Sequence, residues 1–95
     1  MKERLLQLMA HLEINREMKI YFNTKHGQIL KEFDLSMEEE KGKLFLEKDK
    51  LFFENLLDTL SDSLMEKGLK ENDEPNEYGL RIEGVIDVIS EVYYQ

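Results

Sequence analysis

The chain has 95 residues, contains no cysteine and carries a formal net charge of −8. This length suits one domain with one modest core, and the lack of cysteine excludes disulfide bonds, thiolate nucleophiles and cysteine-based metal sites. No apolar run approaches the roughly 18 residues that a membrane span requires, and the N-terminal residues do not have the pattern of a signal peptide. We therefore expect a single soluble, cytoplasmic domain over residues 1–95.

The negative charge is confined to the C-terminal half of the sequence. Residues 1–50 contain ten acidic and ten basic residues, whereas residues 51–95 contain eleven acidic and only three basic residues. Such a charge repels nucleic acid and anionic membranes and attracts basic protein surfaces. We expect no direct binding to nucleic acid or membrane, and we expect any partner surface to be basic.

The N-terminal half has the periodicities of one helix and three strands. Apolar residues three and four positions apart predict a helix over residues 2–14. Alternating apolar and polar residues predict a strand over 17–23. A second alternating run predicts a strand over 28–35, which a turn at Gly27 would join to the first strand as a hairpin. Residues 43–47 have the length and the flanking lysines of a third, edge strand.

The C-terminal half has the pattern of two helices. Asp49 is placed to cap the first helix, and Gly68 is a suitable C′ residue at its end. The segment 69–79 holds the only proline and is predicted to be a loop, followed by a last helix, with a strand over 78–83 as the alternative. At the centres of the apolar stripes we expect Leu56, Leu60 and Ile86 to be buried together. The predicted fold is α+β, with an N-terminal helix, a three-stranded antiparallel sheet and two C-terminal helices.

Residues with catalytic or metal-binding chemistry are few. His11 falls on a predicted helix and His26 in a predicted turn, and neither has a second ligand at helical spacing. The serines lack the G-x-S-x-G context, and no glycine cluster resembles a phosphate loop. An acidic segment over residues 72–83 has the length of a calcium-binding loop, but Glu77 stands where such a loop requires glycine. We expect no enzymatic activity, no cofactor and no metal site.

Acidic residues recur at intervals of four along both predicted C-terminal helices. The first row is Glu54, Asp58, Asp62 and Glu66, and the second is Glu83, Asp87 and Glu91. Neither row has a basic residue on its own face, and like charges at this spacing destabilise a helix by about 0.2–0.5 kcal/mol per pair. Four residues of helix rise about 6 Å, which is close to the spacing of phosphates along an extended nucleic-acid strand. The rows are candidates for binding a basic protein by imitating phosphates, and a surface that serves solubility alone is the alternative.

Aromatic residues suggest a second class of function. Phe52 lies beside the main apolar stripe and Tyr94 follows Tyr93, so one ring of each pair could be exposed. Packing in the core or against a second copy is the commoner role of such rings, and a partner-binding anchor is the other. With an edge strand near Leu44, these rings would suit a self-associating structural or assembly protein, such as a homodimer.

The predicted layout and the acidic charge resemble those of small phage-encoded anti-CRISPR proteins, some of which bind the basic nucleic-acid groove of a Cas effector. The resemblance covers the order of elements over most of the chain and includes no sequence motif, so no functional residue is transferred from it. It implies a non-enzymatic inhibitor whose acidic side chains between residues 54 and 91 occupy phosphate sites.

Overall fold

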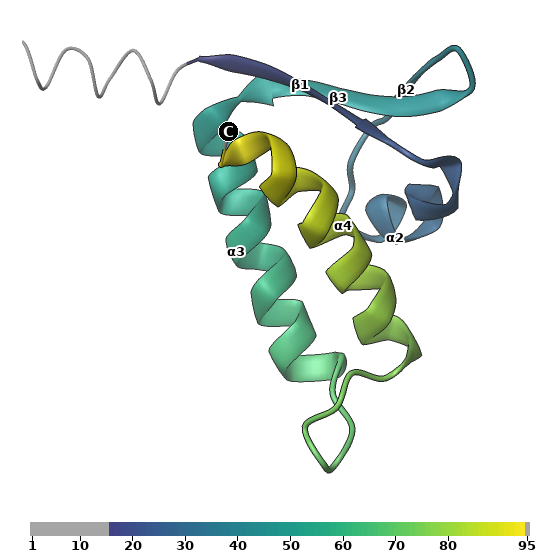
Figure 1. The fold of residues 1–95 in the computed structure, drawn as a ribbon, viewed down its shortest axis with the longest axis vertical. Helices are drawn as coiled ribbons and strands as arrows, with labels where there is room; N and C mark the ends of the chain where they lie inside the picture. The colour runs from purple at the N-terminus through teal and green to yellow at the C-terminus, as the bar shows by residue number, and fades with distance from the viewer. Residues whose placement is uncertain (1–15, 95) are drawn as a thin grey trace, which may run out of the picture.

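A computed structural model describes residues 16–94 as a small antiparallel sheet at one end of a long pair of helices (Figure 1). The strands are β1 (Glu17–Phe22), β2 (Glu38–Glu40) and β3 (Lys43–Asp49). The helices are the 3₁₀ turn η1 (Thr24–His26), α2 (Gly27–Glu32), α3 (Lys50–Lys67) and α4 (Glu77–Tyr93). The α+β class and the three-stranded antiparallel sheet are confirmed, and the helix predicted over residues 2–14 lies outside the described residues. Over these residues, no helix combines the length and the apolar character needed to cross a membrane.

The strand order of the sheet is β1-β3-β2, with both pairs antiparallel. The strand predicted over residues 43–47 is confirmed as β3, but it is the central strand, so its predicted place at an edge of the sheet is wrong. Ile20 of β1 lies opposite Leu46 of β3, and both side chains are buried on the inner face of the sheet. Lys41 and Gly42 connect β2 to β3 with φ angles of 51° and 79°, and two successive residues with positive φ are typical of tight hairpin turns.

The strand predicted over residues 28–35, and with it the hairpin with the first strand, is also wrong, because this segment begins as α2. The neighbouring residues Ile29 and Leu30 are both buried, whereas a strand sends successive side chains to opposite faces. Asn23 stabilises the preceding turn, since its side-chain oxygen accepts a hydrogen bond of 3.0 Å from the backbone N–H of Lys25. The missing strand is β2, which consists of three glutamates and so has no apolar alternation that could reveal it.

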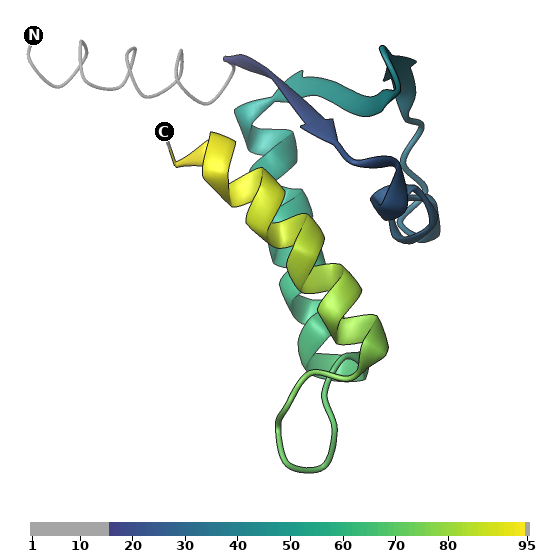
Figure 2. The ribbon, with the colours of Figure 1, turned by 45° about the vertical axis from the view of Figure 1, so that its right-hand side comes forward.

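The helices α3 and α4 lie side by side in opposite directions (Figure 2). Asp49 caps α3 as predicted, because its carboxylate accepts a hydrogen bond of 2.8 Å from the N–H of Phe52. Asn76 caps α4 by accepting a bond of 2.8 Å from the N–H of Gly79, and its own amide group donates to the carbonyl of Lys67 at 2.8 Å. One asparagine side chain therefore ties the end of α3 to the start of α4.

Two glycines allow α3 and α4 to approach each other beside this cap. A Cβ atom on Gly79 would overlap the carbonyl oxygen of Gly68. Gly68 ends α3 as predicted, but its φ of −95° is not the left-handed conformation of a C′ glycine, so the reason for glycine here is the close contact. Residues 78–83 are part of α4, so the strand alternative for this segment is wrong.

The core joins the inner face of the sheet to the stripes of the helices. Its fully buried large side chains are Phe22, Phe53, Ile20, Leu30, Leu60, Ile82, Ile89 and Val85. Leu56 and Leu60 are buried as predicted, but Ile86 is only partly buried. The reason is that α4 packs against β1 as well as α3, which shifts its buried stripe away from Ile86 and toward Val85.

Candidate protein-interaction surface

The acidic residues of both predicted rows lie on the solvent side of α3 and α4. The acidic hairpin face comprises Glu54, Asp58, Asp62, Glu66, Glu83, Asp87 and Glu91. All of these residues are exposed except Glu83, which is half-buried. Asp58 and Asp62 stand two positions on either side of the buried Leu60, and two residues turn a helix by about 200°. Their carboxylates therefore point away from the core. On α4, Asp87 and Glu91 stand two positions on either side of the buried Ile89, so their carboxylates also point away from the core.

The two rows lie on helices that are antiparallel and in contact. At one end, Tyr93 of α4 lies near Glu54 of α3, and the pKa of the Tyr93 hydroxyl is raised by burial and then by this carboxylate. At the other end, Gly68 approaches Gly79. The rows thus run in opposite directions along two adjoining helices.

Most of these acids have no basic partner in the part of the chain that the structure describes. No ion pair there involves Asp58, Asp62, Glu66, Asp87 or Glu91. The arginine of α4, Arg81, pairs instead with Glu77 at 3.0 Å, outside the two rows. The charge of the acidic hairpin face is therefore available to a partner.

Large apolar side chains are interleaved with the acids. The exposed fractions are 44% for Leu51, 70% for Met65, 58% for Leu80 and 75% for Tyr94. Leu51 and Met65 stand seven positions on either side of Asp58. Leu80 of α4 and Tyr94, which directly follows α4, have the same spacing around Asp87. Seven residues make nearly two full turns, so each set lies along one line of its helix. Among these four, sequence reasoning identified only Tyr94, although the spacing of seven was a readable signal.

The other residues predicted for self-association are placed differently. Phe52 is half-buried, and its ring packs edge-on against Phe53 with centroids 5.6 Å apart. The ammonium group of Lys48 lies 5.5 Å from the centre of the Phe52 ring. Leu44 lies on the central strand β3, so it is not at an edge of the sheet. These residues do not form the surface that the sequence suggested.

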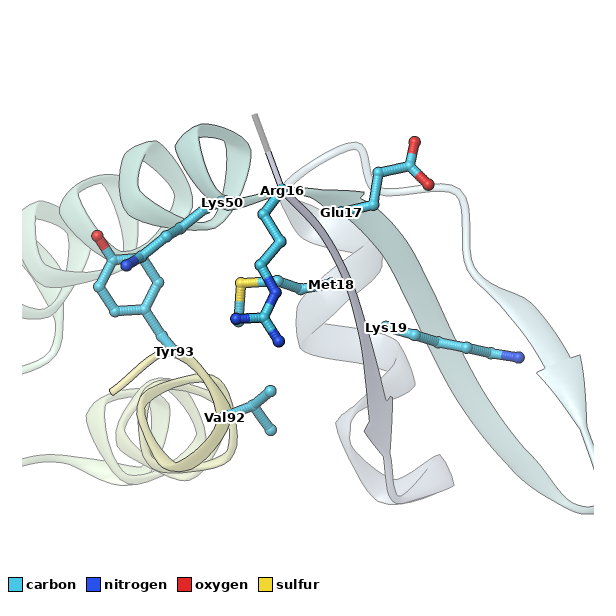
Figure 3. A pocket seen from close by; sticks show the side chains of 7 residues that line it. All are labelled: Arg16, Glu17, Met18, Lys19, Lys50, Val92 and Tyr93. Atoms are coloured by element: carbon cyan, nitrogen blue, oxygen red, sulfur yellow. The ribbon is translucent and has the colours of Figure 1, made fainter. Parts of the chain in front are cut away.

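A pocket of about 270 Å³ lies between the start of β1 and the end of α4 (Figure 3). Arg16 and Met18 line it from the strand side, and Lys50 and Tyr93 line it from the helices. The ammonium group of Lys50 is 5.0 Å from the centre of the Tyr93 ring. Three of its seven lining residues are basic and one is acidic, so the pocket differs in chemistry from the acidic hairpin face.

His26 is buried rather than exposed in a turn. Its ring packs against α4 at Gly84, where a Cβ atom would lie 3.0 Å from the imidazole Cε1. Burial, and then the charge of Lys25, lowers the pKa of His26. The side chain contributes to the packing of η1 on α4 as a neutral imidazole.

Metal binding finds no support in the described residues. Within 16–94, no three histidine, aspartate or glutamate side chains gather as a group that could hold an ion. The acidic segment over 72–83 does not form a loop, because its second half belongs to α4.

Comparisons with known proteins give no further guide to function. No model of a protein family matches the chain, and neither the search of curated proteins nor that of solved structures found a match. The basis for a functional proposal is therefore the surface itself.

Proposed function

We propose that this chain is a non-enzymatic binding module whose acidic hairpin face docks on a basic protein surface. The observation that carries the proposal is that exposed acids on two adjoining helices lack basic partners in the described chain. Five like-charge contacts at i,i+4 cost about 1–2 kcal/mol together. Lysine and arginine side chains of a partner would relieve this repulsion, so binding has a source of free energy that the isolated chain does not use.

The specific form that we propose is an inhibitor that imitates nucleic-acid phosphates toward a nucleic-acid-binding protein in the cytoplasm. The rise of about 6 Å between successive acids of a row supports this form, as does the resemblance in acidic charge to small anti-CRISPR proteins. The exposed Leu51, Met65, Leu80 and Tyr94 add a requirement, because a groove that covers them has to offer apolar contacts between its basic side chains.

The test uses a partner captured from the native host and the double variant Asp58→Asn/Asp62→Asn. Binding should weaken, whereas the free energy of unfolding should stay level or rise slightly because like-charge repulsion is relieved. The matched control is Glu38→Gln/Glu39→Gln, which also removes two exposed charges but from β2. This control should bind the partner as the unmodified chain does.

Salt provides a second measurement on the same complex. Affinity should fall as the salt concentration rises, because exposed charges are screened beyond about 8 Å at physiological ionic strength. A genuine partner whose affinity changes neither with salt nor with the double substitution would contradict the proposal. The exposed apolar residues, Tyr94 first, would then be the place to search for the binding site.

A further inference from the structure

The strand β1 has an open edge. It pairs with β3 on one side, and no strand among the described residues pairs with its other side. The N–H of Lys50 donates to the carbonyl of Arg16 at 2.9 Å, which shows that the even-numbered residues of this strand bond toward β3. Because alternate residues of an antiparallel strand bond to the same neighbour, the N–H and C=O groups of Glu17, Lys19 and Tyr21 point to the open edge.

The two edges of the sheet are protected to different degrees. β2 consists of three glutamates, Glu38–Glu40, and repels a second copy of itself. β1 contains one glutamate and one lysine and therefore has no net charge. Its lysine, Lys19, lies over the sheet (Figure 3), with its ammonium group 2.9 Å from Glu40 and 4.3 Å from the centre of the Phe45 ring. The ammonium group of Lys19 therefore contacts Glu40 and Phe45 and does not shield the open edge. For this reason β1 is the edge that another strand can join.

We propose that β1 pairs antiparallel with β1 of a second copy of this chain, which joins the two sheets into one. A two-fold axis perpendicular to the sheet keeps the outer faces of both copies on the same side. Residues that lie opposite each other must therefore both point outward or both point inward. Two registers satisfy this condition with an overlap of five residues, one centred on Lys19 and the other on Ile20.

Side-chain chemistry selects the register centred on Ile20. The other register places Lys19 opposite Lys19, and like charges directly opposite each other are destabilising. Centring on Ile20 places Lys19 opposite Tyr21 on the outer face, where the ammonium group of Lys19 already lies 5.3 Å from the centre of the Tyr21 ring in its own chain. On the inner face, Met18 lies opposite Phe22 and Ile20 opposite itself, so no charged group is brought to that face, where Ile20 and Phe22 are already buried in their own chain. The strand is self-complementary in this register, which favours a second copy over an unrelated strand.

The first test is the oligomeric state of the full chain, measured by sedimentation with three forms of the protein. The unmodified chain and Lys19→Ala should sediment as a species of twice the chain mass of 11.3 kDa, because both keep the outward N–H at position 19. Lys19→Pro removes that N–H. Because this N–H does not bond to β3, and because proline is tolerated at an edge where the N–H faces solvent, the sheet itself should be preserved. This variant should remain folded by circular dichroism and sediment as a monomer.

The second test reports the register and does not depend on the proline variant. The chain has no cysteine, so single cysteines can be introduced without a background. Ile20→Cys should form a disulfide between copies, because opposite residues of a non-hydrogen-bonded pair have Cα atoms about 4.5 Å apart. Lys19→Cys should not, since in this register the two cysteines are displaced by about 7 Å along the strands in addition to the spacing between them.

Salt separates this interface from the acidic hairpin face. Two chains of net charge −8 repel each other, so pairing should strengthen as salt rises, whereas binding of a basic partner should weaken. A chain that is monomeric at all concentrations and at high salt, or a dimer that survives Lys19→Pro, would overturn the proposal. Cross-linking through Lys19→Cys and not through Ile20→Cys would overturn the register. None of these outcomes bears on the binding of a basic partner, because Asp58 and Asp62 lie outside β1.

Discussion

Two residues of α3 show how the cost of a substitution depends on the side of the helix that a residue occupies. Leu60 is fully buried, and Leu60→Ala removes packed atoms and leaves a cavity, so urea unfolding should show a loss of about 2–5 kcal/mol. Met65 is mostly exposed, and Met65→Ala should change the free energy of unfolding by less than about 0.5 kcal/mol. Equal losses for the two variants would mean that α3 presents a different side to the core.

The buried imidazole of His26 makes the stability of the fold depend on pH. Burial, and then Lys25, lowers the pKa of His26 below the ordinary value of 6.5. At a pH between the lowered pKa of His26 in the folded chain and the ordinary value of 6.5 in the unfolded chain, His26 binds a proton in the unfolded chain and not in the folded one. The contribution of His26 is therefore complete above about pH 6.5 and is lost as the pH falls from there toward the folded pKa.

Thermal unfolding between about pH 7.5 and 5.5 measures this contribution. The melting temperature of the unmodified chain should fall across this interval, and His26→Gln should reduce the slope because it removes the titrating group. If the slope is the same in the variant, the pH dependence does not come from His26.

At the scale of elements, the contact between α3 and α4 depends on glycine at their junction. Gly79→Ala would place a methyl group on the carbonyl of Gly68, so the free energy of unfolding should fall by about 3 kcal/mol as the helices separate. Gly42→Ala is the control, because no atom lies within 4 Å of the added Cβ and only the positive φ of 79° is unfavourable for alanine. The free energy of unfolding of this variant should fall by about 1–2 kcal/mol. If Gly79→Ala costs no more than this control, the close approach of the helices is not required.

The elements that could be predicted from the sequence are those with an uninterrupted period. β1, α3 and α4 have such periods, and Asp49 supplied a cap whose chemistry is readable without the structure. The segment of α2 could not be assigned, because apolar residues at 29, 30, 33 and 35 fit an alternating pattern as well as a short helical turn. β2 could not be predicted either, since pairing with β3 and the turn at Lys41 and Gly42 are what make three glutamates a strand.

At the scale of the whole molecule, the acidic excess lies on the two long helices and not on the sheet. The half of the sequence with an acidic excess forms α3 and α4, whereas the half with balanced charge forms the sheet. The acidic rows could be predicted because a spacing of four residues is sufficient to align side chains on a helix. The apolar residues between them, such as Leu80, could not be identified as exposed, because their exposure depends on which side of α4 packs against β1 and α3. The open edge of β1 could be recognised only from the strand order.

The three carboxylates of β2 also set a limit on aggregation. A sheet with two unprotected edges can add further copies at both ends, and this is how fibrils grow. In this molecule one edge repels its own copies, and a two-fold pairing through the other edge leaves only repelling edges at both ends of the enlarged sheet. In the pairing that we propose, association through β1 stops at two copies, and the glutamates of β2 would protect concentrated protein against fibril formation.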